Sequence, residues 1–163
     1  MVFNVTLKKI GVFMKGHPEI LDCLNQLLCN EITAGNQFIV HSRMLESWGV
    51  KKLGKLEYDA SMDEMNHADE VIKRILFLEG VPNVQKIDRI HVGLSVKEII
   101  EADLKCEHKN FNDLKKFAAK AEELQDYASK DLFVSILKSE EEHIDWLENQ
   151  LHLIQQIGIQ NYI

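Results

Sequence analysis

Two short segments of the sequence hold the residues best suited to chemistry. Each has the pattern Glu-x-x-His, with Glu64 followed by His67 and Glu140 followed by His143. Residues three apart lie on the same face of an α-helix, so each pair would direct a carboxylate and an imidazole to one point. The two pairs are 76 residues apart, which suggests a duplicated helical hairpin.

A further glutamate precedes each pair at the same distance. Glu31 lies 33 residues before Glu64, and Glu107 lies 33 residues before Glu140. A single glutamate, or one Glu-x-x-His pair, more often belongs to a solvated helix face or a salt bridge. The repeated intervals argue against that interpretation for the whole set. We therefore expect a dinuclear metal site formed by Glu31, Glu64, His67, Glu107, Glu140 and His143.

The ligand types indicate which metals such a site would take. Four carboxylates can balance the four positive charges of two divalent irons, and oxygen ligands with some imidazole suit iron or manganese. Bridging carboxylates hold two metals close together, and their negative charge favours Fe(III) over Fe(II). Cys23, Cys29 and Cys106 lie outside this set and form no CxxC pair, so the cysteines favour a reducing, cytoplasmic compartment over a disulfide framework.

Four long helices are needed to position these ligands. Apolar residues recur at steps of three and four, and the predicted ligands fall on the same stripes. Pro18 and Glu19 indicate the start of the first helix, Gly49 indicates its end, and Ser95 with Glu98 forms a capping box for the third. The helices are expected over about residues 17–49, 51–78, 95–121 and 126–158.

Loop lengths then predict the topology. Short connections join the first pair of helices and the second pair, whereas residues 83–94 form a long crossover. The sequence therefore predicts an all-α, ferritin-like four-helix bundle with one long crossover between helices two and three. We expect an N-terminal extension over residues 1–16, in part disordered, the bundle over residues 17–158, and a short C-terminal remnant over residues 159–163 that cannot form an independent helix.

Overall charge and hydropathy exclude some functions. The net charge of −7 disfavours non-specific nucleic-acid binding, which needs a basic surface, and is compatible with attraction of cations. No run of 18 apolar residues predicts a membrane span, and residues 1–13 do not have the features of a signal peptide. We expect neither a nucleic acid nor a membrane as a partner.

The chain resembles the bacterioferritins from Met14 to about Ile163. The resemblance is carried by Asn30-Glu31, by YDASMDEMNHAD at 58–69, by RILFLEG at 74–80, by EEHIDWL at 141–147 and by IQNY at 159–162. It implies intracellular iron storage in a shell of 24 subunits built from two-fold dimers. It also implies a ferroxidase centre with two irons in each subunit that oxidises Fe(II) with oxygen or hydrogen peroxide, and a possible reductant protein for iron release.

Individual roles follow from the same resemblance. Glu31 and Glu107 would be terminal ligands, one for each iron, and Glu64 and Glu140 would bridge the irons. The two histidines would each give one nitrogen.

Met65 is a separate candidate. It follows Glu64, so it is rotated by about 100° around the helix and should face outside the bundle. The resemblance implies that Met65 is an axial ligand of haem b at the dimer interface, with one methionine from each subunit. The alternative is a methionine that only fills a subunit interface.

Three features depart from the family pattern. Phe38 stands where a tyrosine is usual, and it can neither donate a hydrogen bond nor form a tyrosyl radical. An inner-surface iron site uses a histidine and an aspartate; here the positions are Asp59 and Asp63, so only Asp63 matches, although two carboxylates could still attract iron. The usual short fifth helix is largely missing after Ile159.

The sequence leaves three alternatives open. The chain could be a haem-free bacterial ferritin, a di-iron or di-manganese redox enzyme that acts on peroxide or an organic substrate, or a non-enzymatic shell subunit. The complete ligand set argues against the last.

Overall fold

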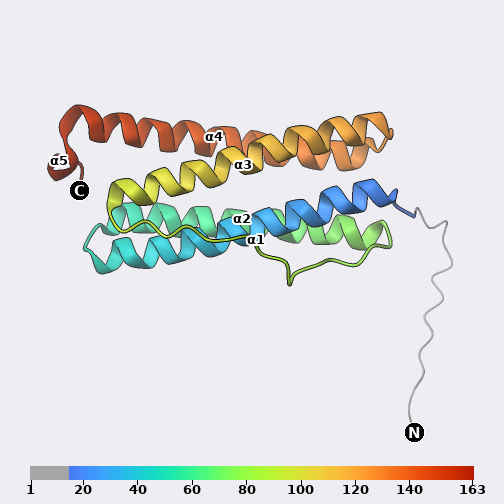
Figure 1. Ribbon diagram of the computed structural model, residues 1–163, viewed down its shortest axis with the longest axis horizontal. Helices are drawn as coiled ribbons and strands as arrows, with labels where there is room; N and C mark the ends of the chain where they lie inside the picture. Colours follow the sequence, from blue (N-terminus) through green and yellow to red (C-terminus); the bar gives the residue numbers. More distant parts are fainter. Residues whose placement is uncertain (1–14) are drawn as a thin grey trace, which may run out of the picture.

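A computed structural model describes residues 15–163 and shows four long helices and one short helix, with no strand in that range (Figure 1). The expectations for residues 1–13 lie outside the described residues. The all-α prediction is confirmed. The helices are α1 (Pro18–Ser47), α2 (Lys51–Phe77), α3 (Val96–Glu123), α4 (Tyr127–Ile157) and α5 (Ile159–Tyr162).

The four long helices form two hairpins that lie side by side along the long axis (Figure 1). α1 packs closely against α2, and α3 packs closely against α4, as their short connections require. The crossover between α2 and α3 returns along the outside of the bundle. Each hairpin therefore places two helices that carry predicted ligands next to each other, and the crossover joins the two hairpins.

Local signals in the sequence fix the helix ends. Gly49, with a φ of 87°, ends the turn after α1, and Gly158, with a φ of 78°, follows α4. Ser95 caps α3 by accepting a hydrogen bond from the Glu98 N–H at 3.2 Å. The Glu98 carboxylate accepts from the Leu94 N–H at 2.9 Å, so the reciprocal bond of the capping box lies one residue earlier than expected.

The apolar core is divided into two clusters. One contains Leu24 and Phe133, and the other contains Leu45 and Leu147. On every long helix, buried polar residues lie between the positions that belong to the two clusters. Because burial of apolar surface contributes about 25 cal/mol per Å², these clusters can offset the cost of a polar middle layer.

The crossover has no regular structure, but α1 side chains satisfy several of its backbone N–H groups. Thr33 Oγ1 accepts from the Asp88 N–H at 2.9 Å, and Gln37 Oε1 accepts from the His91 N–H at 2.9 Å. His41 Nε2 accepts from the Gly93 N–H at 3.0 Å. The three α1 residues are four apart, so one face of α1 holds the crossover in place.

The C-terminal residues form one helical turn, α5, where the sequence predicted a remnant. This turn is not independent, because the Tyr162 hydroxyl donates to Gln150 Oε1 of α4 at 3.0 Å. Within residues 15–163, no helix has the length and apolar character needed to cross a membrane.

Candidate metal centre

The six predicted ligands come from all four long helices and meet in the polar middle layer. α1 gives Glu31, α3 gives Glu107, and α2 and α4 each give a glutamate and a histidine. Their ligand atoms form two groups, within each of which the atoms lie within 4.8 Å of one another. The groups are Glu31, Glu64, His67 and Glu140, and Glu64, Glu107, Glu140 and His143.

The two groups share Glu64 and Glu140. Each group then has one glutamate and one histidine of its own. This is the arrangement that two metals require when two carboxylates bridge them and each metal has a terminal carboxylate and an imidazole. The structure thus brings together all the residues that the repeated spacing singled out.

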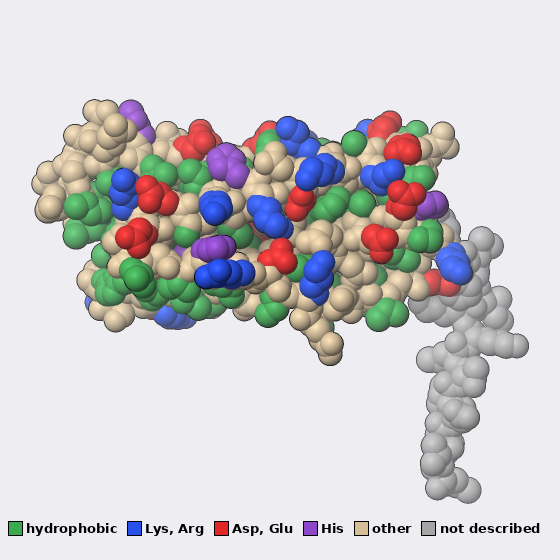
Figure 2. Space-filling view, in the orientation of Figure 1, with side chains coloured by type: hydrophobic (Ala, Val, Ile, Leu, Met, Phe, Trp, Pro, Cys, Tyr) green, Lys and Arg blue, Asp and Glu red, His purple; other side chains and the backbone are tan. Residues whose placement is uncertain are grey.

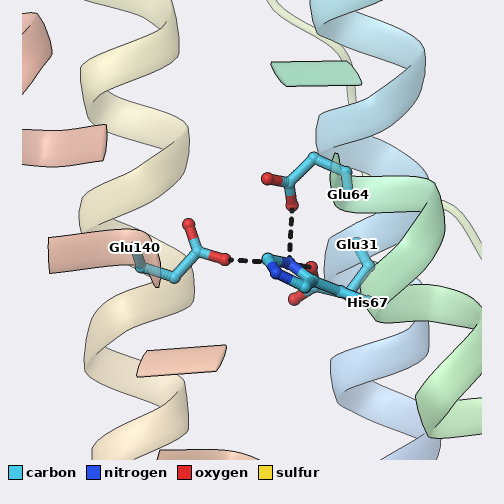
Figure 3. A group of neighbouring side chains, drawn as sticks. All are labelled: Glu31, Glu64, His67 and Glu140. Atoms are coloured by element: carbon cyan, nitrogen blue, oxygen red, sulfur yellow. Dashed lines mark hydrogen bonds and ion pairs between the residues drawn. The ribbon is translucent and has the colours of Figure 1, made fainter. Parts of the chain in front are cut away.

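Both histidines present Nδ1 to the carboxylates. His67 Nδ1 lies 3.1 Å from Glu31 Oε2, and His143 Nδ1 lies 2.9 Å from Glu107 Oε1. Figure 3 shows the first group, in which Glu64 and Glu140 also point toward His67, at 3.9 Å and 3.7 Å from Nδ1. Nδ1 is therefore the nitrogen of each ring that would bind a metal.

The four glutamates are almost completely buried, with exposures between 0% and 3%. Each has a buried carboxylate oxygen with no hydrogen-bond partner among the described residues. Burial raises the pKa of all four well above the ordinary value, and repulsion between the carboxylates raises it further. Unpaired acceptors of this kind need either protons or cations, so the donor set fits a cluster of metal ions.

A cavity of about 310 Å³ leads to this group between α2 and α4. Its lining includes Glu64, Glu140 and His143, together with the acidic side chains of Asp59, Asp63 and Glu142. Asp59 also forms an ion pair with Lys55 at 2.5 Å. A divalent cation that enters this cavity would meet carboxylates next to the predicted ligands.

Aromatic residues border the second half of the group. Phe38 is fully buried, and its ring packs edge-on against His143 with centroids 5.4 Å apart. Trp146 stacks on the same imidazole with centroids 6.0 Å apart. Burial lowers the pKa of His143, which keeps its ring neutral and able to bind a metal.

Sequence reasoning missed a second buried polar cluster in the same layer. Asp103 accepts hydrogen bonds from Gln37 at 2.7 Å and from His41 Nδ1 at 2.8 Å. Glu57 is 1% exposed and has no hydrogen-bond donor among the described residues, and burial and Asp103 raise its pKa. Asp103 lies four residues before Glu107 and therefore on the same helical face. This spacing was the sequence signal that could have indicated a buried Asp103 beside the predicted ligands.

Met65 points away from the metal centre. It is 46% exposed, whereas its neighbour Glu64 is 3% exposed. A Cβ atom added at Gly35 would lie 3.4 Å from Met65 Sδ, so the sulfur sits against the surface of α1. Two further exposed apolar residues of α2, Met62 and Leu76, lie at helical spacings from it.

Residues 21–157 match the sequence profile of the ferritin-like domain. The bacterioferritin of Brucella melitensis biotype 1 is 44% identical over 149 residues, which cover 91% of this chain and 92% of the relative. The bacterial ferritin of Synechocystis sp. is 44% identical over 151 residues, covering 92% and 97%. The bacterioferritin of Mycobacterium tuberculosis is 42% identical over 149 residues, covering 91% and 94%. The chain therefore belongs to the ferritin-like family, among the bacterioferritins.

Proposed function

We propose that this protein stores iron and oxidises Fe(II) to Fe(III) at the dinuclear centre. The observation that carries this proposal is the sharing of Glu64 and Glu140 by two groups of potential ligands. Iron is the substrate of this site as well as the cargo of the assembly. The names of the related bacterioferritins support iron storage.

The ligands provide a physical reason for oxidation. Four carboxylates in a buried site stabilise the higher charge of Fe(III) more than that of Fe(II), because electrostatic interactions are stronger at low dielectric. Two Fe(II) ions can give one electron each to hydrogen peroxide, which takes up two protons and leaves as two waters. Oxygen is the other oxidant that fits. Phe38 cannot supply a further electron, so all electrons come from iron or from another residue.

The acidic cavity supports delivery of Fe(II) to the centre. Asp59, Asp63 and Glu142 line the same cavity as three of the ligands. We propose that these carboxylates raise the local concentration of Fe(II) before it reaches Glu64 and Glu140. The carboxylates that line this cavity also favour a cation over an apolar organic substrate at these ligands.

A substitution that keeps side-chain volume tests the oxidation. Glu107→Gln removes one charge and one metal ligand from the centre, and we expect the initial rate of Fe(II) oxidation in stopped-flow absorbance to fall by about tenfold or more. Glu101→Gln is the matched control, because Glu101 is an exposed residue on the same helix. An unchanged rate in Glu107→Gln would remove this residue from the centre.

Assembly and haem complete the proposal. We propose a cytoplasmic shell of 24 subunits of 18.8 kDa each, built from two-fold dimers, with a reductant protein for iron release. Met65 is 46% exposed on α2, one helical turn from the exposed Met62, which fits an interface between two copies. Two such methionines, one from each copy, would hold a haem b, which supplies a redox-active iron between the subunits.

A further inference from the structure

Three basic side chains line a second cavity, and none of the six predicted ligands is part of its lining. This cavity has a volume of about 280 Å³ and lies where the crossover passes over α1 and α3. Arg89 lies on the crossover, and Lys105 and Lys109 lie on α3. Figure 2 shows Lys and Arg side chains gathered near histidines in the middle of the face along which the crossover runs.

The charge at this cavity is positive, although the whole chain carries −7. Asp88 is the only acidic residue in its lining, and the Asp88 carboxylate lies 3.1 Å from Lys109 Nζ. Lys109 also lies 3.5 Å from Asp113. Arg89 and Lys105 have no ion-pair partner within residues 15–163. Two cations therefore remain uncompensated at one cavity.

The cavity also contains a buried donor without an acceptor. Asn110 is 1% exposed, and its amide nitrogen has no hydrogen-bond partner in the described part of the chain. An unsatisfied buried donor costs about 1–3 kcal/mol. The other amide donors in the lining are occupied, because Asn30 donates to Asp113 and Gln37 donates to Asp103. A ligand that accepts hydrogen bonds would remove the penalty at Asn110.

A metal cation does not fit this cavity. Three cationic side chains, Arg89, Lys105 and Lys109, line it, and Asp88 gives the only carboxylate in the lining, so a divalent cation would be repelled. Unpaired cations and an amide donor instead match an anion with several oxygen acceptors.

We propose that this cavity binds a phosphate-class oxyanion, held by Arg89, Lys105 and the amide of Asn110. The planar guanidinium can donate two parallel hydrogen bonds to such an anion, and the ammonium adds a point charge. The site does not use any of the six metal ligands, so the proposal stands independently of iron oxidation.

The test titrates inorganic phosphate into the metal-free, full-length protein by isothermal calorimetry. We expect one phosphate to bind per subunit, and we expect Lys105→Gln to weaken binding by about tenfold, the effect of losing a charged hydrogen bond. Lys138→Gln is the matched control, because Lys138 is exposed on α4, lies outside the cavity and has no ion-pair partner among the described residues. We expect it to leave the affinity within twofold.

Asn110→Leu gives a second measurement that does not depend on surface charge. We expect this variant to bind phosphate more weakly, yet to melt at a higher temperature than the parent when phosphate is absent, because the unpaired donor is gone. A parallel titration with glycerol 3-phosphate distinguishes the source of the anion: tighter binding of the ester indicates an esterified phosphate, and tighter binding of phosphate indicates the free ion.

Two results would overturn the proposal. One is the absence of binding at millimolar concentrations of both anions. The other is an equal loss of affinity in Lys105→Gln and Lys138→Gln, which would show a general effect of surface charge. Metal-free protein is used throughout, so neither result depends on whether the protein oxidises iron.

Discussion

A glutamate in the core of a helical bundle is destabilising unless a proton or a cation satisfies it. The metal centre has four such residues, and the neighbouring Glu57 and Asp103 add two more. Burial raises the pKa of every one of them, and that of Asp103 rises to about 7. The metal-free protein must therefore keep protons on these groups or accept repulsion between charges.

We predict from these shifts that the metal-free protein loses stability as the pH rises. The folded state binds more protons than the unfolded state between the ordinary carboxyl pKa and the raised one, so the unfolding free energy falls across that window, at about 1.4 kcal/mol per pH unit for each proton. The pKa values of His41 and His143 are lowered in the folded protein. These two residues therefore make stability rise with pH, but only below their ordinary pKa of 6.5. The decrease should thus be clearest above pH 6.5.

Calorimetric melting at pH 6.5, 7.25 and 8 tests this prediction in the presence of a chelator. Glu107→Gln should melt at a higher temperature than the parent and with a weaker pH dependence, whereas Glu101→Gln should follow the parent. Added Mn²⁺ should reverse the trend, because metal then competes with protons for the same oxygens. A melting temperature that rises with pH without metal would contradict the raised pKa values.

At the scale of elements, the crossover depends on a close approach to α3. A Cβ atom at Gly93 would lie 2.3 Å from the Ile99 backbone nitrogen, whereas one at Gly49 would have no atom within 4 Å. Gly49 instead needs its positive φ of 87°. We predict that Gly93→Ala lowers the melting temperature by about 5 °C or more, through displacement of the first turn of α3.

Gly49→Ala is the comparison for this prediction. Its only penalty is the left-handed backbone, about 1 kcal/mol, so its melting temperature should fall by less. Circular dichroism melts of both variants measure the difference. Equal decreases would mean that backbone conformation, not the contact with Ile99, controls this part of the fold.

Some of these elements could be predicted from the sequence because their signals are local or repeated. Gly49, Ser95 and Gly158 act on their own helix ends, and the prediction of four long helices is confirmed. The candidate ligands, which the structure brings together, could be identified because the same intervals occur twice; a single Glu-x-x-His pair would not have been enough.

Other contacts could not be predicted because they occur once and join distant helices. His41 and Asp103 meet across α1 and α3; the spacing of Asp103 from Glu107 indicates the helical face of Asp103 but not its partner His41. The path of the crossover is set by individual bonds such as that from the Gly93 N–H to His41, which leave no periodic pattern. The turn of α5 depends on a contact between Tyr162 and Gln150 that residues 159–163 alone do not reveal.

At the scale of the whole molecule, Met62, Met65 and Leu76 are exposed apolar residues on one side of α2, which also carries the exposed ion pair of Asp69 and Lys73. Exposed apolar side chains commonly lie at contacts between subunits, and a two-fold axis through this side of α2 would bring two copies of the same methionine together. Met65 is exposed and Glu64 is buried, so these adjacent residues are available for different roles, Met65 for contact with another subunit and Glu64 for a site inside one subunit.

We predict that Met65→Leu abolishes haem absorbance while Fe(II) oxidation and the mass of the shell, several hundred kilodaltons by native mass spectrometry, stay unchanged. Leucine keeps the apolar contact but removes the sulfur that would bind haem iron. Met62→Leu is the control, because this methionine is also exposed on α2, at 43%; it should retain haem. Haem retained in Met65→Leu would assign the haem ligand to another residue. A monomer or dimer in place of the shell in both variants would show that the methionines themselves hold the subunits together.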